Sequence, residues 1–252
     1  MVTLQELAHY TDTFLQTDSF RDYCPNGLQV EGKETIGSVI TGVTASLAMI
    51  DVACARQADA VLVHHGYFWK NEDSCITGIK RARLAVLLRN DISLLAYHLP
   101  LDAHPEVGNN VQLGRLLGIQ IDGLLQSRDR DVCGSYGHLD QAIQAETFER
   151  LISTKLRRSC IHVDAGPAMV KTVGWCTGAG QGFIELAVKK NLDAYISGEI
   201  SEPTAHIARE AKIHYFAAGH HATERYGIQA LGEHLRQEFS IRHEFVDIDN
   251  PA

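Results

Sequence analysis

The chain has 252 residues, of which 45% are hydrophobic and 21% are charged, so it has the composition of an ordinary globular protein with one large or two small domains. A formal net charge of −8 argues against a broad nucleic-acid-binding surface, and we expect no sequence-specific nucleic-acid binding. No apolar run approaches the ~18 residues that span a bilayer, and the first residues lack the apolar segment of a signal peptide, so we expect a cytoplasmic protein without a membrane partner.

The first half of the chain predicts helices and strands in alternation. Thr3 and Glu6 form a capping box, which predicts a helix over residues 3–16. Short apolar runs predict buried strands, and the stretches between them predict helices. In chain order these are a strand at 38–43, a helix from Thr44 or Ser46 to about 57, a strand at 60–63, a helix at 78–89, a strand at 92–97 and a helix at 110–117.

The second half has the same order of elements, after an expected boundary region at residues 123–135. The elements are a helix at 146–155, a strand at 173–177, a helix at 183–190, a strand at 194–197, a helix at 203–211, a strand at 214–217 and a helix at 226–239. We therefore predict an α/β fold of two structurally related halves, residues 1–124 and 125–252. The last helix and strand of the chain are expected to pack on the first half.

An internal repeat supports this interpretation. Residues 38–66 align without gaps on residues 172–200, an offset of 134, and six of the 29 positions are identical where chance gives about two. The apolar pattern of the helix between the two strands also matches. We expect an internal duplication whose halves present the carboxyl ends of their strands to a shared cleft, with a metal site in that cleft.

Histidines and carboxylates follow the predicted strands in both halves. His64 and His65 come directly after the strand at 60–63, and a His-x-x-x-carboxylate pattern begins at His98 and at His220. Ligands of open α/β sheets bind at the carboxyl ends of the strands. Each pattern alone is weak, but three such clusters at equivalent strand ends predict one site. Its candidate metal ligands are His64, His65, Asp102, His220 and Glu224.

This donor set favours two ions. Three imidazoles and two carboxylates exceed what one tetrahedral zinc needs, and the set contains no thiolate, so it suits iron, manganese, cobalt, nickel or zinc. Two divalent ions bridged by a water that ionises near neutral pH are the natural arrangement. His98, Glu199 and His221 would then carry protons or orient the ligands.

Two further segments have alternative interpretations. Tyr67, Phe68, Trp69 and Lys70 form an expected loop over the site. There, aromatic rings such as Tyr67 and Trp69 could stack on a base while Lys70 meets a phosphate, or the rings could pack in the core or in a subunit contact. The glycine-rich segment 178–182 could cradle a phosphate. A tight strand-to-helix turn is the favoured interpretation, because the segment fits neither the Walker A nor the dinucleotide pattern.

Six motifs together resemble the Nif-three-like family of dinuclear metal centre proteins, over nearly the whole chain. They are Asn26–Gly32, Gly42–Ser46, Val63–Gly66, His98–Asp102, Asn109–Asn110 and Gly219–Arg225. The resemblance implies an α/β fold with two metal ions per chain, of which iron, manganese and zinc are the leading candidates. It also implies a toroidal homohexamer whose sites face an internal cavity.

The family's label, GTP cyclohydrolase I type 2, implies a function. It would mean hydrolysis of a nucleotide-like small molecule by a metal-bridging hydroxide. The residues themselves leave two alternatives open, namely a non-enzymatic metal-binding or scaffold protein and an iron-dependent oxidase.

Overall fold

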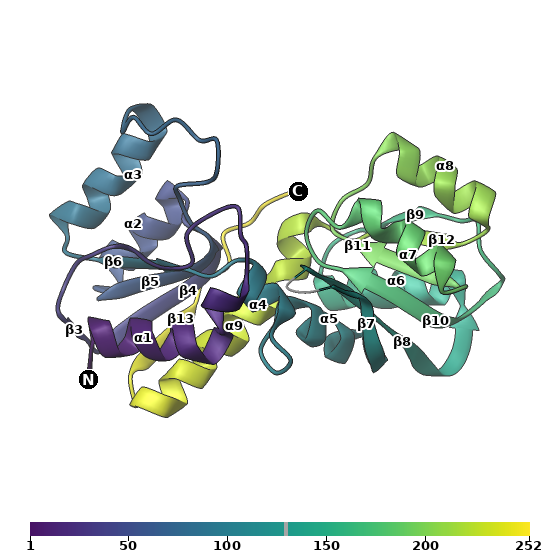
Figure 1. Ribbon diagram of the computed structural model, residues 1–252, viewed down its shortest axis with the longest axis horizontal. Helices are drawn as coiled ribbons and strands as arrows, with labels where there is room; N and C mark the ends of the chain where they lie inside the picture. Colours follow the sequence, from purple (N-terminus) through teal and green to yellow (C-terminus); the bar gives the residue numbers. More distant parts are fainter. Residues whose placement is uncertain (129–130) are drawn as a thin grey trace. The chain divides into compact units, whose positions relative to one another are not determined.

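The protein is a mixed α/β protein, as the sequence predicted. The computed structural model describes residues 1–128 and 131–252, with side chains described outside residues 127–133. The chain divides into two compact units, coloured along the sequence in Figure 1. The N-terminal unit comprises residues 1–107 and 227–249, and the C-terminal unit comprises residues 108–226 and 250–252. Among the described residues, no helix combines the length and the apolar character that crossing a bilayer requires.

The N-terminal unit is built on a five-stranded sheet in the order β13-β4-β5-β6-β2. β13, β4, β5 and β6 run parallel, and β2 pairs antiparallel with β6. A two-stranded antiparallel ribbon of β1 and β3 accompanies this sheet. The strands are β1 Val2–Thr3, β2 Gly27–Val30, β3 Thr35–Ile36, β4 Ser38–Thr44, β5 Ala60–His65, β6 Ser93–Ala96 and β13 Arg242–Phe245.

Helices cover both faces of this sheet (Figure 1). They are α1 Leu4–Leu15, the short 3-10 helix η1 Thr17–Ser19, α2 Leu47–Ala55, α3 Gly78–Arg89, α4 Leu99–Ala103 and the later part of α9 His220–Phe239. Alternate residues of β5 serve opposite faces: Leu62 lies in the core with α1 and α9, and Val61 lies in the core with α2 and α3. The near-continuous apolar run of β5 follows from burial on both faces.

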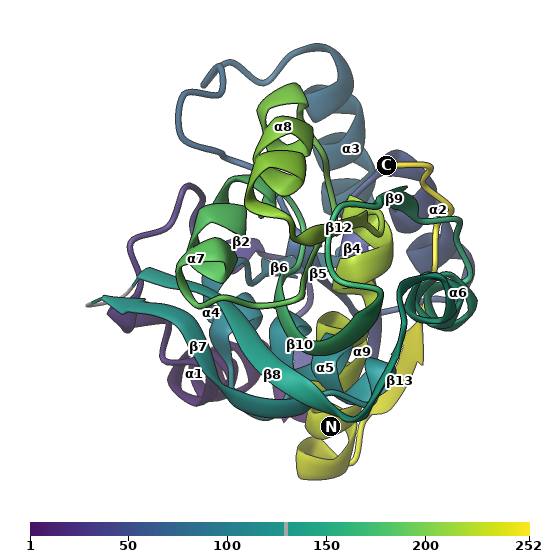
Figure 2. The ribbon, with the colours of Figure 1, turned by 90° about the vertical axis from the view of Figure 1, so that its right-hand side faces the viewer.

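The C-terminal unit is built on a six-stranded sheet in the order β7-β8-β10-β11-β12-β9. β10, β11 and β12 are parallel to one another, and the outer strands pair antiparallel. Figure 2 shows α7 and α8 together on one side of this sheet and α6 on the other. The strands are β7 Gln120–Arg128, β8 Asp131–Gln144, β9 Ile161–Val163, β10 Met169–Cys176, β11 Ala194–Ser197 and β12 His214–Ala217. The helices are α5 Asn109–Leu117, α6 Ala145–Leu156, the 3-10 helix η2 Gln181–Phe183, α7 Ile184–Lys189 and α8 Glu202–Ala211.

The two units repeat one local arrangement at the start of the first parallel strand. The carboxylate of Asp59 accepts the amides of Gly37 and Ser38, each at 3.0 Å. Asp193, which is 134 residues later, accepts the amides of Lys171 and Thr172 at 2.9 and 2.8 Å. The strand registers also correspond, since Val39 pairs with Ala60 and Val173 pairs with Ala194. These matches support the internal duplication, which itself stays a prediction, as does the division into halves at residue 124.

Most predicted elements agree with the structure. β10 is longer than predicted, because it begins at Met169 instead of at residue 173. Three further predictions differ. β5 continues through both His64 and His65 instead of ending at residue 63, and α9 begins at His220 instead of at residue 226. The expected boundary region 123–135 contains parts of the paired strands β7 and β8, apart from residues 129–130, which lie outside the described residues. β5 and α9 both extend over polar residues that the sequence placed outside them. They can do so because strand pairing and helix hydrogen bonds are made by the backbone and tolerate polar side chains.

We expect Asp59→Ala and Asp193→Ala each to lower the free energy of unfolding by about 1–3 kcal/mol, because each leaves two partly buried amides without their acceptor. Urea unfolding followed by fluorescence and circular dichroism measures the change. Asp51→Ala, on the exposed side of α2, is the control and should change stability by less than about 0.5 kcal/mol. Equal stability of all three variants would show that this arrangement contributes nothing.

Candidate functional site

The N-terminal unit gathers three of the predicted imidazoles at the carboxyl ends of β5 and β6. The rings of His64 and His65 lie 4.5 Å apart, and His98, which follows β6, lies 5.1 Å from His64 and 5.7 Å from His65. One nitrogen from each ring lies within 4.8 Å of the other two. Successive side chains of a strand usually point to opposite faces, but at the end of β5 these two neighbouring rings lie together. We call His64, His65, His98 and Asp102 the N-terminal half-site.

The backbone fixes the orientation of His64. Its Nδ1 lies 2.9 Å from the carbonyl oxygen of Tyr97, which can only accept a hydrogen bond, so Nδ1 carries the proton. In the neutral ring the lone pair is then on Nε2, which faces Oδ1 of Asp102 at 3.5 Å. His64 is fully buried in the structure. A fixed tautomer with its lone pair beside a carboxylate is the arrangement of a metal-ligating histidine.

His98 is held by a residue that the sequence did not single out. Its Nδ1 donates to Oδ1 of Asp22 at 2.7 Å, and its amide donates to Oδ1 of Asn26 at 2.8 Å. Asp22 also accepts the side-chain amide of Asn26 and the backbone amide of Leu99, each at 2.9 Å. The loop that carries Asp22 and Asn26 lacks any helix or strand period, and of these two residues only Asn26 belongs to a motif that the sequence singled out, Asn26–Gly32.

The ionisation of Asp22 follows from these contacts. Burial by itself would raise the pKa of the carboxyl group, but the hydrogen bonds from His98, Asn26 and Leu99 outweigh burial and hold the pKa below its usual range. Asp22 is therefore a carboxylate at neutral pH. It fixes the proton of His98 on Nδ1, which leaves the lone pair of a neutral His98 on Nε2.

The C-terminal unit gathers a histidine and two carboxylates. The chain turns after β12 at Gly219, whose φ is +97°, and α9 begins at His220. Nδ1 of His220 lies 2.7 Å from Oε1 of Glu199, and Nε2 lies 3.3 Å from Oε2 of Glu224, one helical turn later. Glu199 comes just after β11, at the position that matches His65 in the repeat. We call His220, Glu199 and Glu224 the C-terminal half-site.

These two carboxylates favour the protonated form of His220. The hydrogen bond with Glu224 contributes most, and although burial opposes it, the added charge of Glu224 and the contact with Glu199 raise the pKa of His220 to about 9. In the absence of a competing cation, the ring of His220 is therefore protonated on both nitrogens and positively charged at neutral pH. A cation that binds Nε2 has to displace that proton.

The glycine-rich segment after β10 makes room for Glu224. A Cβ at Gly178 would lie 2.1 Å from Oε1 of Glu224, and the residue has a φ of +62°, so only glycine fits there. The carbonyl oxygen of Gly178 accepts the amide of Gly198 at 2.9 Å. A 3-10 turn then leads into α7. The segment is thus a tight turn against the half-site, as the favoured interpretation had it.

The aromatic loop after β5 contains one core residue and one neighbour of the half-site. Tyr67 is buried among residues of α2 and α3, and its hydroxyl donates to the carbonyl of Ala45 at 2.7 Å. With 4% of its surface exposed, Tyr67 offers no open face for the base stacking that the sequence suggested. Trp69 is half-buried, with its ring edge-on to His98 at 5.0 Å. Lys70 is exposed.

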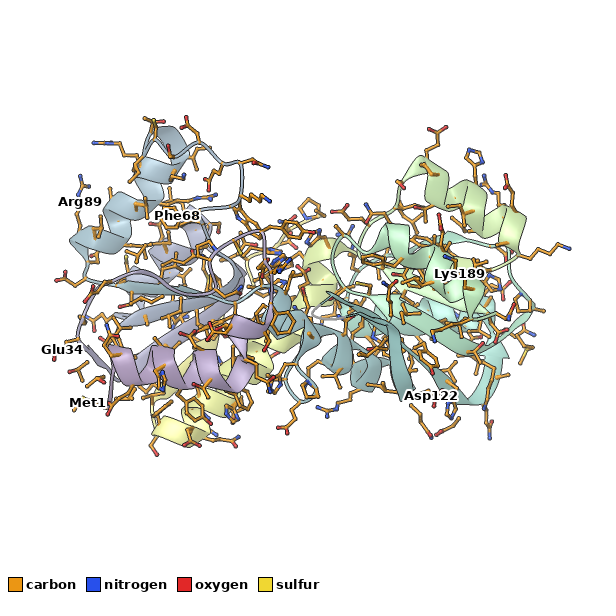
Figure 3. All side chains as sticks on the ribbon, viewed as in Figure 1. Met1, Glu34, Phe68, Arg89, Asp122 and Lys189 are labelled. Carbon is orange, nitrogen blue, oxygen red and sulfur yellow. The ribbon has the colours of Figure 1, made fainter. Side chains whose placement is uncertain are left out.

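Phe68, labelled in Figure 3, is exposed and lies beneath the ammonium group of Lys80 at 5.5 Å. His221 is buried at the second position of α9, and its amide donates to the carbonyl of Ala252. The catalytic role of His221 stays a prediction, as do those of His98 and Glu199.

The donor chemistry of both half-sites fits a divalent cation. Each offers an imidazole Nε2 beside a carboxylate oxygen, in His64 with Asp102 and in His220 with Glu224. In each pair the opposite ring nitrogen is held by another acceptor, the Tyr97 carbonyl or Glu199. Such outer partners orient histidine ligands around metals. Mixed nitrogen and oxygen donors suit zinc, iron or manganese.

Comparison with known proteins identifies relatives that span the whole chain. A family model described as Duf34/NIF3 (NGG1p interacting factor 3) matches residues 2–251. A Pseudomonas aeruginosa protein named GTP cyclohydrolase 1 type 2 homolog is 51% identical over 251 residues, covering 100% of this chain and 99% of the relative. A Vibrio cholerae protein of the same name is 53% identical over 240 residues, covering 94% and 95%.

Solved structures agree with the fold. The protein ybgI, described as of unknown function, superposes with a TM-score of 0.96 at 48% sequence identity over all of both chains. A protein from Thermus thermophilus superposes with a TM-score of 0.89 at 32% identity, again over all of both chains.

We expect Glu224→Gln and Glu199→Gln each to lower the pKa of His220 from about 9 toward its ordinary value of 6.5, with the larger effect from Glu224. NMR titration of the imidazole in chelator-treated protein measures it. Because folding raises this pKa, the ion pair stabilises the metal-free protein fully below about pH 6.5 and stops doing so as pH rises through about 9.

Glu202→Gln, which neutralises an exposed carboxylate on α8, serves as the control and should leave the pKa of His220 unchanged. A His220 pKa that is the same in all three variants would contradict the assigned contacts.

Proposed function

The chain belongs to the Duf34/NIF3 family, and from that premise we propose that it is a dinuclear-metal-dependent hydrolase of a nucleotide-like small molecule. One observation carries the proposal: each unit holds a histidine whose Nε2 faces a carboxylate while its Nδ1 is fixed by a second acceptor. A ligand arrangement of this kind in each unit suits a two-ion site.

The proposed ligands come from both units. His64, His65 and Asp102 of the N-terminal half-site and His220 and Glu224 of the C-terminal half-site would together hold two divalent ions, of which iron, manganese and zinc suit the donors. His64 and Glu224 are buried, where a polar side chain costs stability unless it has a partner, and this burial supports their role as ligands.

Two ions at such a site supply Lewis acidity, which activates water for attack on an electrophilic carbon. Side chains of the protein accept and donate the protons of the reaction. His98, with Asp22 holding Nδ1–H, has its Nε2 available to take a proton and return it to a leaving group. Glu199 is a positioning residue, because its contact with Nδ1 keeps Nε2 of His220 directed toward Glu224.

The substrate class rests on chemistry beside the N-terminal half-site and on the names of the relatives. The half-buried ring of Trp69 lies next to His98 and offers a surface for a base, and the exposed Lys70 offers a cation for phosphate. The relatives are named GTP cyclohydrolase 1 type 2 homologs, so GTP is the first substrate to test.

The proposal includes a cytoplasmic homohexamer, as the family resemblance implies. Light scattering of the purified full chain measures the mass directly. A particle of six 27.8 kDa chains supports this part of the proposal, and a monomer contradicts it without affecting the metal ligands.

We expect His64→Gln and His220→Gln each to reduce the bound metal substantially, because each removes a ligand from a different unit. Metal analysis after reconstitution with Mn²⁺ or Zn²⁺ and desalting measures the loss, with circular dichroism to check folding. His206→Gln, an exposed histidine of α8, is the matched control and should retain full metal. Unchanged metal in both ligand variants would contradict the site.

The affinity should also depend on pH in a defined direction. Binding at His220 displaces a proton from a group whose pKa is about 9, so affinity should rise with pH by about tenfold per unit through the neutral range.

We expect metal-loaded protein to hydrolyse GTP or another nucleotide, and His98→Gln to lower kcat by about 10²–10⁴-fold while leaving the bound metal unchanged, because this variant removes only the proton carrier. Turnover over a panel of nucleotides, with product identified by mass spectrometry, measures it. Full metal occupancy without turnover of any nucleotide would contradict the hydrolase and favour a metal-binding protein.

A further inference from the structure

A second group of imidazole and carboxylate side chains lies at the edge of the C-terminal sheet, outside both half-sites. His162 is in the edge strand β9, and His214 begins the neighbouring strand β12. Antiparallel pairing sets Phe216 opposite His162 and Tyr215 opposite Val163. Because side chains two apart on a strand share a face, His162 and Asp164 lie on the same face of the sheet as His214. We call His162, Asp164, His214 and Glu149 the edge cluster.

The donor atoms of this cluster converge. Nε2 of His162 lies 3.1 Å from Nδ1 of His214, and Nδ1 of His214 lies 3.4 Å from Oδ1 of Asp164. One atom from each of the three residues lies within 4.8 Å of the other two. The side chains of His162 and His214 are 8% and 1% exposed, whereas Asp164 is 74% exposed. The cluster therefore consists of two buried imidazoles and one carboxylate that is exposed to solvent.

The outer partners determine where the protons of the two rings are. Nε2 of His214 lies 2.7 Å from the carbonyl oxygen of Pro167, which only accepts, so Nε2 carries the hydrogen and Nδ1 the lone pair. Nδ1 of His162 lies 3.0 Å from Oε2 of Glu149, which as a carboxylate also accepts, so Nδ1 carries the hydrogen. In the neutral rings the lone pairs of His162 Nε2 and His214 Nδ1 then face each other. That arrangement is repulsive unless a proton or a metal cation lies between them.

We propose that His162, His214 and Asp164 bind one divalent transition-metal ion of the zinc class, and that Glu149 positions His162. Two nitrogens on one zinc, each at ~2.0–2.1 Å, lie about 3.3 Å apart at the tetrahedral angle, so only a few tenths of an ångström separate the observed rings from that geometry. Asp164 supplies the third ligand, and water from the exposed side completes four-coordination. A carbonyl and a carboxylate on the opposite ring nitrogens are the partners that zinc-binding histidines have.

The choice of a cation over a proton rests on the third ligand. A shared proton would need only the two imidazoles, whereas Asp164 adds an anionic oxygen 3.4 Å from the same nitrogen. The donors are two nitrogens and one oxygen, so first-row divalent ions such as Zn²⁺ bind better than Ca²⁺ or Mg²⁺. An ion here would join β9 to β12 at a sheet edge that has no further strand partner among the described residues.

The test uses the full chain after chelation, in a His64→Gln/His220→Gln background that disables the proposed two-ion site. Zn²⁺ is titrated by calorimetry, and Co²⁺ absorption reports the coordination geometry. We expect one Zn²⁺ to bind, His162→Gln to abolish binding, and Asp164→Asn to weaken it at least about tenfold. Glu149→Gln should weaken it about 10–100-fold, because it removes only the orienting charge.

The matched control is His206→Gln, which alters an exposed histidine of the same unit whose ring lies 3.9 Å from a carboxylate of Glu202. It should bind Zn²⁺ as the background does. The same variants on the wild-type chain should lower the Zn²⁺ stoichiometry by one, which keeps the test valid if the double background fails to fold. The proposal is overturned if no Zn²⁺ binds outside the two-ion site, or if His162→Gln and Asp164→Asn bind it as His206→Gln does.

Discussion

Hydrogen bonds from ring nitrogens to fixed acceptors are the constraint on which the candidate site depends. An imidazole ligates a cation through one nitrogen only when its proton is held on the other. In the N-terminal unit the carbonyl of Tyr97 holds the proton of His64, and in the C-terminal unit Glu199 contacts Nδ1 of His220. The carbonyl of Tyr97 and the carboxylate of Glu199 thus have the same role, which is to orient the ring of a histidine through its Nδ1. The parallel sheets matter because they carry these acceptors to the same edge as the histidines.

The structure also connects glycine placement to this chemistry. Glu224 is buried against the turn after β10, where Gly178 leaves its carboxylate room that any Cβ would fill. A short turn with left-handed backbone thereby determines how close a carboxylate approaches His220. The glycine-rich segment thus contributes to the site because the missing side chain of Gly178 leaves room for the carboxylate of Glu224.

Much of this arrangement follows from sequence patterns, and the exceptions have physical reasons. The apolar runs of β5 and β11 predicted strands because both faces are buried, and Thr3 with Glu6 predicted the start of α1 through a capping box that the structure contains. Asp22 escaped notice because it acts from an irregular loop on a residue 76 positions away. Tyr67 and Trp69 are both aromatic residues of the same loop, so the sequence does not distinguish them. Only the packing in the structure shows that Tyr67 lies in the core and Trp69 beside His98.

The position of β13 in the sheet of the N-terminal unit has a consequence for biosynthesis. This strand, which lies near the end of the N-terminal unit, pairs with β4 and becomes the edge strand of a sheet whose other strands are all synthesised before residue 97. Until the ribosome has released the far end of the chain, β4 presents open backbone donors and acceptors, which invite intermolecular pairing. The N-terminal unit, whose synthesis begins first, is therefore completed only after residues 108–226 of the other unit have been synthesised.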